Sequence, residues 1–239
     1  MRVLGLIPAR YASGRFPGKP LIDLKGKPMI QRVWEQAMRA KSLDAVAVAT
    51  DDLRIKRVVE AFGGVAVMTP VSCASGTDRI AMAVRKLGLK PAMVVNIQGD
   101  EPLLPPAMID QLVEVLKKSG APMATLCRPL GPGDLANPHA VKVVLGLNGR
   151  ALYFSRAAIP HARDKAALAS VGLHVGLYAY RAPFLQQLAR LKPTPLEKIE
   201  KLEQLRVLEN GFGIAVGLTR LRSHSVDTPA DAQRIRRLI

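Results

Sequence analysis

Apolar and polar residues follow two patterns along the first hundred residues. Short apolar runs predict strands, and stretches with apolar residues three or four positions apart predict helices. The expected strands span residues 2–7, 45–49, 65–68 and 92–97. The expected helices span residues 28–38, 52–62 and 77–87. Strands alternating with helices predict an α/β fold with a doubly wound, mostly parallel sheet.

The run at 92–97 is apolar without alternation, as expected of a central parallel strand that is buried on both faces. It is followed by the polar residues Gln98, Asp100 and Glu101. They should lie at the carboxyl edge of the sheet, beside the loop that follows the first strand. Ligands of open α/β sheets bind at this edge.

The second half of the chain is less regular. A helix is expected at 105–118, strands at 123–127, 140–147 and 171–180, and helices at 184–191, at 196–209 and from Pro229 onward, with a loop at 128–139. No linker or internal repeat divides the sequence. We therefore expect a single domain over 1–239 that carries a smaller lobe at about 128–209.

The helix expected at 196–209 has an apolar residue at every third position. These residues are Leu196, Ile199, Leu202, Leu205 and Leu208. At this spacing they sweep around the helix, which predicts a buried or interface helix and suggests a homodimer. On a helical wheel drawn for this segment, Glu203 lies within the apolar sector. A buried acid needs a partner, either a cation such as Arg206 or Lys201, or a ligand hydroxyl.

The loop after the first strand is basic and rich in glycine and proline. Pro8 ends the apolar run, and Arg10, Arg15 and Lys19 follow within the next eleven positions. Such a loop suits a polyphosphate, although arginines in a solvated turn are the alternative. It is not a Walker loop, because Pro20 follows Lys19, and the chain has no GxGxxG motif.

Two acidic positions are candidates for Mg²⁺, which prefers carboxylate oxygens. Asp100 follows the buried strand, and Asp227 precedes Pro229. Each also has a structural alternative, as a charge at a helix N-terminus or as the cap of the last helix. The residue pattern alone does not decide between these two interpretations.

The formal net charge of +16 would by itself favour a nucleic-acid-binding protein. The basic residues form no uninterrupted run, however, and aromatic residues make up only 4% of the chain. We therefore expect small anionic substrates and no nucleic acid, with an RNA-binding module as the alternative from a different class.

Cys73 and Cys127 are the only cysteines, and neither belongs to a CxxC motif or a Cys/His cluster. This composition excludes a recognisable zinc site and is typical of a reduced, cytoplasmic protein. The first apolar run is much too short for a membrane span. We expect a cytoplasmic protein with no membrane partner.

Several motifs resemble, in the same order, those of the 3-deoxy-manno-octulosonate (Kdo) cytidylyltransferase family, also called CMP-Kdo synthetases. They are PARYAS at 8–13, PGKPL at 17–21, SGT at 75–77, QGDEP at 98–102, AVKV at 140–143, YFSR at 153–156, His174 with Gly176 and Tyr178, PLE at 195–197, LEQLRVL at 202–208 and VDTP at 226–229. The resemblance covers nearly the whole chain.

The resemblance implies a fold like that of the nucleotide-diphospho-sugar transferases and the transfer of CMP from CTP to Kdo for lipopolysaccharide synthesis, by a homodimer. Catalytic roles fall on Lys19, Arg10, Asp100 and Asp227, with Mg²⁺ on the two aspartates. Nucleotide binding falls on Ala9, Arg10, Arg15, Lys19, Ser75, Gly76 and Gln98. Sugar binding falls on Arg156, His174, Tyr178, Glu203 and Gln204.

Two departures bear on the sugar. Before Val226 the family often has small, glycine-type residues, whereas this chain has His224 and Ser225. Leu173 stands where the family usually has a basic residue before the histidine, and the interval at 163–170 is shortened. A related sugar acid, such as an 8-amino analogue of Kdo, is therefore an alternative substrate.

Overall fold

The computed structural model describes residues 2–12, 16–161, 163 and 170–239. The chain forms two compact units, one made of residues 1–110 with 222–239 and the other of residues 111–221. The lobe expected at 128–209 falls within the second unit. Each unit is described below from its own residues.

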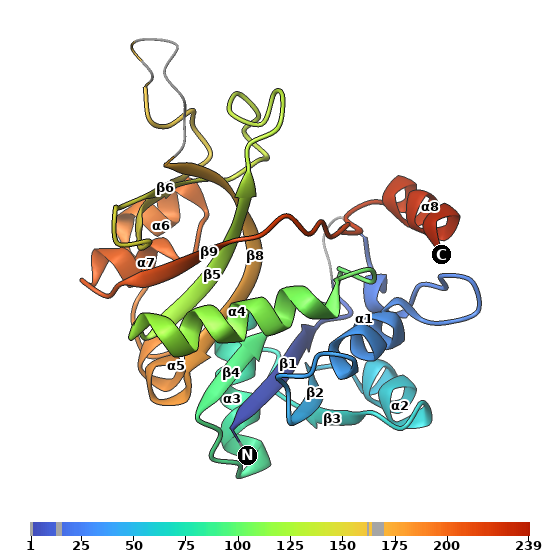
Figure 1. The fold of residues 1–239 in the computed structure, drawn as a ribbon. Helices are drawn as coiled ribbons and strands as arrows, with labels where there is room; N and C mark the ends of the chain where they lie inside the picture. The colour runs from blue at the N-terminus through green and yellow to red at the C-terminus, as the bar shows by residue number, and fades with distance from the viewer. Residues whose placement is uncertain (1, 13–15, 162, 164–169) are drawn as a thin grey trace. The chain divides into compact units, whose positions relative to one another are not determined.

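The first unit contains a parallel sheet. Its strands are β1 (Val3–Ala9), β2 (Ala45–Thr50), β3 (Val65–Met68) and β4 (Met93–Asn96). β1 pairs with β2 on one side and with β4 on the other, and β3 pairs with β2. Figure 1 shows the resulting order β4, β1, β2, β3. The parallel α/β architecture expected from the sequence is confirmed.

Helices connect these strands in sequence. They are α1 (Met29–Met38), α2 (Leu53–Ala61) and α3 (Gly76–Leu87). The chain moves outward from β1 to β3 and then returns to β4, on the other side of β1. Right-handed connections therefore place α3 on the opposite face of the sheet from α1 and α2, as in a doubly wound fold.

The first strand extends through Pro8 to Ala9, two residues beyond the predicted end at Ile7. Proline has no N–H, so within a sheet it usually costs a ladder hydrogen bond. On the side that Pro8 faces, however, the neighbouring strand β4 ends opposite Leu6. The missing N–H therefore leaves no bond unmade, and β1 remains paired with β2 as far as Ala9.

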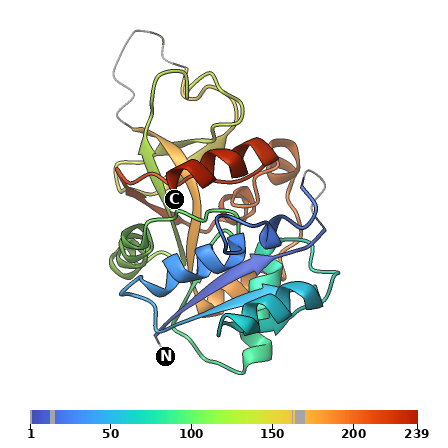
Figure 2. The same ribbon diagram turned by 90° about the vertical axis from the view of Figure 1, so that its right-hand side faces the viewer.

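The C-terminal segment belongs to the first unit. Its helix α8 (Pro229–Leu238) begins with a capping box between Thr228 and Asp231. Both views show α8 near the blue segment that leads into α1 (Figures 1 and 2). Arg236 donates to the Asp23 carbonyl at 2.7 Å. The two segments share a core made of Leu24, Met29, Val226, Ala232 and Ile235.

Helix α4 (Pro106–Ser119) begins in the first unit and ends in the second. Its bounds match the expected helix at 105–118 to within one residue at each end. None of the helices in the described part of the chain is long and apolar enough to cross a membrane.

The second unit has a mixed sheet. Its strands are β5 (Met123–Pro129), β6 (Lys142–Leu145), β7 (Ala151–Ser155), β8 (Val171–Arg181) and β9 (Ile214–Leu218). β5 is antiparallel to β8 and parallel to β9, and β6 is antiparallel to both β7 and β8. β7 and β9, each only five residues long, were not predicted from the sequence.

The single helix expected at 196–209 is wrong. The helices of the second unit are α5 (Ala182–Leu188), α6 (Pro195–Glu200) and α7 (Leu205–Glu209). α6 ends at Lys201, whose φ of +55° is left-handed and stops the helix. The helical wheel therefore fails: Ile199 is 76% exposed, whereas Leu202 and Leu205 are buried.

Candidate active site

A cleft of about 500 Å³ opens in the first unit at the carboxyl ends of β1 and β4, and we call it the β1–β4 cleft. It is lined by Pro8, Ala9, Arg10, Ala12, Lys19, Pro20, Gly76, Arg79, Gln98, Gly99, Asp100 and Asp227. Most of the residues predicted to bind the nucleotide or Mg²⁺ are thus brought together. Arg15 lies outside the described residues.

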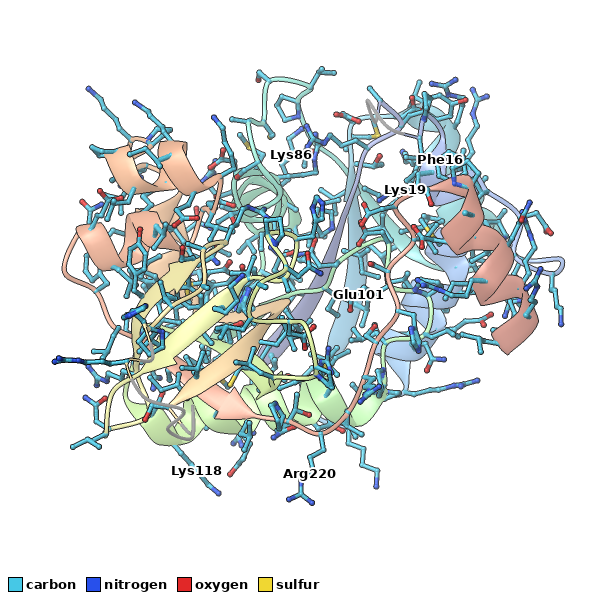
Figure 3. All side chains as sticks on the ribbon, turned by 90° about the horizontal axis from the view of Figure 1, so that it is seen from above. Phe16, Lys19, Lys86, Glu101, Lys118 and Arg220 are labelled. Carbon is cyan, nitrogen blue, oxygen red and sulfur yellow. The ribbon has the colours of Figure 1, made fainter. Side chains whose placement is uncertain are left out.

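Lys19 lies between the two predicted metal ligands. Its Nζ is 2.7 Å from Oδ2 of Asp100 and 3.6 Å from Oδ1 of Asp227. The backbone places the two aspartates together, because Val226 N donates to the Asp100 carbonyl at 2.9 Å. Lys19 itself belongs to a short 3₁₀ turn, Lys19–Leu21. Lys19 is labelled in Figure 3, as is Glu101, which follows Asp100 in the chain.

The donor set suits Mg²⁺. Within the described ranges, no group of three or more His, Cys, Asp or Glu side chains is arranged to hold a metal ion. Mg²⁺, however, commonly takes only one or two protein carboxylates and completes its shell with water and substrate phosphates. Asp100 and Asp227 both approach the single cationic Nζ of Lys19, so their oxygens converge on one position. These two carboxylates could hold the ion.

Glu101 differs from its neighbour Asp100. Burial raises the pKa of Glu101 to about 7, although the nearby Ser223 side chain opposes the shift and the charge of Asp100 adds to it. Near neutral pH a large fraction of this carboxyl is therefore protonated. Asp100 is the better candidate for a metal ligand.

Both ends of the basic loop are fixed in the described structure. Gly18 N donates to the Tyr11 carbonyl at 2.9 Å, and Gly18 has a φ of +71°, which a glycine adopts without strain. The Arg54 guanidinium stacks on the Tyr11 ring, 3.3 Å from its centroid. Asp52 holds that guanidinium through Nε at 2.9 Å and a terminal nitrogen at 2.6 Å. The stack anchors Tyr11, which follows Arg10 in the chain.

The floor of the cleft depends on a close backbone approach. A Cβ on Gly99 would lie 2.8 Å from the Pro8 carbonyl oxygen, so only glycine fits. Gly76 and Gln98 line the cleft beside it. The hydroxyl of Ser75, another predicted nucleotide residue, caps helix α3 by accepting from Asp78 N at 3.1 Å.

Arg79, which no sequence pattern indicated, lines the cleft although its side chain is only 1% exposed. Its terminal nitrogens donate to Asp51 at 2.7 Å and to the Thr69 hydroxyl at 2.6 Å. The available signal was Asp51, an acid at the end of a buried strand that needs a partner.

The second unit has a pocket of about 430 Å³ beside β8, which we call the β8 pocket. It is lined by Asn137, His139, Ala140, Val141, Leu173, His174, Gly176, Tyr178, Leu202 and Gln204. Three of the predicted sugar residues, His174, Tyr178 and Gln204, thus line one pocket. Asn137 and His139 come from the loop at 128–139, where the sequence pointed to no site.

His174 is neutral, and its tautomer follows from its partners. Burial lowers its pKa to about 3. Its Nε2 lies 3.0 Å from the Thr125 hydroxyl, whose single proton has the carbonyls of Val175 and Leu177 as acceptors within reach, at 3.0 and 2.9 Å. When the hydroxyl donates to a carbonyl, its oxygen accepts from Nε2, so the network favours the tautomer in which Nε2 donates to Thr125 and Nδ1 is a hydrogen-bond acceptor.

Gln204 has a buried donor that no group in the described structure satisfies. Its side chain is 4% exposed, the Tyr178 hydroxyl donates to its Oε1 at 3.3 Å, and its Nε2 has no hydrogen-bond partner. Burial raises the pKa of Tyr178 well above its usual value, and the charges of Tyr180 and then Glu203 add to this. Gln204 thus brings a buried, unsatisfied donor to the lining of the β8 pocket.

The remaining two predicted sugar residues do not line the pocket in the described part of the chain. Arg156 donates through Nε to the Glu200 carbonyl at 3.0 Å and through a terminal nitrogen to the Pro138 carbonyl at 3.3 Å. Glu203 is half-buried and acts electrostatically on Tyr178. Arg206 was one of the cations expected to pair with Glu203. It forms an ion pair with Glu197 and has at least one further interaction.

Comparisons with known proteins agree with this arrangement. The family model described as cytidylyltransferase matches residues 4–220. The 3-deoxy-manno-octulosonate cytidylyltransferase of Syntrophobacter fumaroxidans is 55% identical over 98% of this chain and 96% of its own. The enzyme of the same name from Vibrio cholerae is 50% identical with the same coverage.

A solved structure gives the same result in three dimensions. It is a CMP:2-keto-3-deoxy-manno-octonic acid synthetase complexed with CTP, which is 41% identical and covers 100% of this chain and 98% of its own, with a TM-score of 0.93. A thymidylyltransferase from Bacillus anthracis, 17% identical with a TM-score of 0.65, shares the fold. The chain therefore belongs to the cytidylyltransferase family and, within it, to the 3-deoxy-manno-octulosonate cytidylyltransferases.

Proposed function

We propose that the protein transfers CMP from CTP to the anomeric hydroxyl of Kdo, giving CMP-Kdo and pyrophosphate. The observation that carries this proposal is the placement of Lys19 against Asp100 and Asp227 at the carboxyl edge of a parallel sheet. It provides one cation for phosphates and two carboxylates for a metal within the same cleft.

The β1–β4 cleft binds CTP. Arg10 and Lys19 carry the positive charge that the β- and γ-phosphates require, and the Gly99 backbone allows the nucleotide to approach the strand ends. Gly76 and Gln98 line the part of the cleft that receives the cytidine. Mg²⁺ bound to Asp100 and Asp227 would neutralise charge on the α-phosphate and lower the pKa of the attacking hydroxyl.

The β8 pocket binds the sugar acid. The Nδ1 of His174 accepts a hydrogen bond from a sugar hydroxyl, and the unpaired Nε2 of Gln204 donates to a sugar oxygen. Tyr178 holds the Gln204 amide in this orientation through its hydroxyl. These residues select and orient the sugar acid within the β8 pocket.

The direct test is pyrophosphate release by the purified protein with CTP, Kdo and Mg²⁺, with CMP-Kdo identified by mass spectrometry. ATP, GTP and UTP replace CTP in parallel, and 8-amino-Kdo replaces Kdo. Release that requires both CTP and Kdo is expected. Release with CTP and 8-amino-Kdo alone would assign the analogue as substrate, and no release with either sugar would reject the proposal.

The assembly we propose is a homodimer in the cytoplasm. On the second unit, Leu152 and Ile199 are 63% and 76% exposed, and they offer apolar surface that a second copy of the chain would cover in such a dimer. Light scattering coupled to gel filtration measures the mass directly, and a monomer of 25.8 kDa would reject the dimer.

A further inference from the structure

Lys142 is a buried cation in the second unit. Its side chain is fully inaccessible, at 0% exposure, although lysine is rarely buried completely. It begins β6, where it is paired with Ser155 on β7 and Leu173 on β8. Burial lowers its pKa. A position this costly for a charged group calls for an explanation.

The ammonium group uses all three of its hydrogens. Nζ donates to the backbone carbonyls of Asn137 at 2.9 Å, Ala140 at 2.6 Å and Arg156 at 2.6 Å. An ammonium ion has three donors and no acceptor, so this set satisfies it completely. Lys142 thus ties the loop before β6 to the residue that follows β7.

Arg156 completes the arrangement from the other side. Its guanidinium donates to the Pro138 carbonyl at 3.3 Å and to the Glu200 carbonyl at 3.0 Å. Its backbone N–H is held at 3.0 Å by the Glu200 carboxylate. Two cations therefore bind the carbonyl oxygens of residues 137, 138 and 140.

The segment held in this way is a wall of the β8 pocket. Asn137, His139, Ala140 and Val141 all line the pocket, and the Val141 carbonyl accepts from His174 N at 2.8 Å. The cations hold this segment by its backbone oxygens. The position of the wall opposite Tyr178 and Gln204 is thereby set.

We infer that Lys142 is a positioning residue for the sugar acid: it sets the shape of the β8 pocket by holding residues 137–140 and Arg156, without itself lining the pocket. This inference rests on the proposed function, because it takes the β8 pocket as the sugar site. It goes beyond that function in assigning sugar affinity to a buried lysine.

The test compares Lys142→Met with Lys118→Met. Methionine keeps the length and the apolar stem of the side chain but removes the three donors. Lys118 is 77% exposed and points away from the ribbon in Figure 3, so Lys118→Met controls for the loss of one positive charge. Michaelis constants for Kdo and CTP, kcat and the thermal midpoint are measured for each.

We expect Lys142→Met to raise the KM for Kdo by about 10- to 100-fold, the range that follows when buried hydrogen-bonding groups lose their partner. The KM for CTP should change by less than about twofold, because neither Lys142 nor the segment it holds lines the β1–β4 cleft. Hydrogen exchange of a peptide spanning 134–145 should become faster. Lys118→Met should match the wild type in all three.

An unchanged KM for Kdo in folded Lys142→Met would overturn the inference. So would equal rises in both Michaelis constants with a large drop in thermal midpoint, which would indicate general destabilisation. If Lys142→Met does not fold, Lys142→Arg decides. It keeps the charge, but its planar fork cannot reproduce three converging N–H bonds, so a wild-type KM for Kdo would reject the role.

Different results would reject the inference and the proposed function. Absence of CMP-Kdo formation by the wild-type protein would reject the function. The hydrogen-exchange comparison needs no substrate, and unchanged exchange at 134–145 in folded Lys142→Met would reject the inference whether or not the wild type is active.

Discussion

The Nζ of Lys19 lies 2.7 Å from Oδ2 of Asp100, and the two side chains are only 15% and 29% exposed. Asp227 lies on the same Nζ at 3.6 Å. Three segments thus meet at the ammonium group of Lys19: the loop after the first strand, the end of a central strand and the C-terminal segment. A bound triphosphate with its metal would bring both signs of charge into this position, and the cleft holds groups that complement each.

The first prediction concerns Lys19. If it neutralises the outer phosphates, Lys19→Ala should weaken CTP binding by about 10- to 100-fold, as expected for the loss of a charge-assisted hydrogen bond. CMP lacks those phosphates, so its binding should change far less. Calorimetric titration with both nucleotides measures the difference. Equal losses for CTP and CMP would assign Lys19 a structural role.

The second prediction concerns the metal. Asp100→Asn and Asp227→Asn each remove a charged ligand while keeping the shape of the side chain, and each should abolish turnover at any Mg²⁺ concentration reached in the assay. Asp23→Asn, at an exposed position whose backbone carbonyl accepts from Arg236, is the matched control. Steady-state rates as a function of Mg²⁺ are measured. Near-normal rates in either cleft variant would show that the ligands are assigned wrongly.

The third prediction concerns the stack of Arg54 on Tyr11. Exposed cation–π contacts contribute about 0.5–1 kcal/mol, so Arg54→Ala should raise the KM for CTP by about 2- to 5-fold through a less ordered loop. Arg57→Ala, an exposed arginine on the same helix, removes equal charge without touching Tyr11. Only the first variant should alter CTP kinetics. Matching effects in both would attribute the change to net charge.

The sequence predicted the first unit well because its elements obey simple periodicities. The buried run at 92–97 and the helices capped at Asp52 and Ser75 leave few other arrangements, and the carboxyl edge then gathers the basic loop with Asp100. The position of Asp227 needed the family resemblance. No local pattern indicates that a residue so late in the chain returns to the first strand's edge.

The second unit was harder to predict for a local reason. The three-residue apolar spacing at 196–208 is compatible with a helix, and no glycine or proline marks the break at Lys201. A non-glycine residue with positive φ is uncommon and has no reliable sequence signal. The buried Lys142 was missed because a lone lysine in a strand normally faces solvent.

The fourth prediction is a pH dependence from Glu101. Folding raises the pKa of Glu101 from its ordinary value of 4.5 to about 7, so between these values the unfolded chain loses the proton while the folded chain keeps it. Its contribution to stability is therefore full below the lower value and is lost as the pH rises through the window, with a slope of up to about 1.4 kcal/mol per pH unit. Glu101→Gln cannot ionise. The free energy of unfolding is measured by urea titration at pH 5, 6, 7 and 8 for the wild type and for Glu101→Gln. It should fall less with pH in the variant. Parallel curves would contradict the raised pKa of Glu101.

The last prediction concerns Gln204, whose buried Nε2 donor has no partner in the described structure. Leaving a buried donor unsatisfied costs free energy. A ligand whose oxygen accepts a hydrogen bond from Nε2 removes this cost and therefore binds more tightly. Gln204→Glu keeps the shape but replaces the donor by an acceptor, which would repel an acidic sugar. We therefore expect the KM for Kdo to rise by about 10-fold or more, with the KM for CTP nearly unchanged. Gln187→Glu, an exposed position on α5, introduces the same charge away from the β8 pocket and should leave both constants at wild-type values. A Gln204→Glu enzyme with wild-type sugar kinetics would mean that Nε2 does not contact the sugar, and the β8 pocket would then lose the observation that most directly supports it.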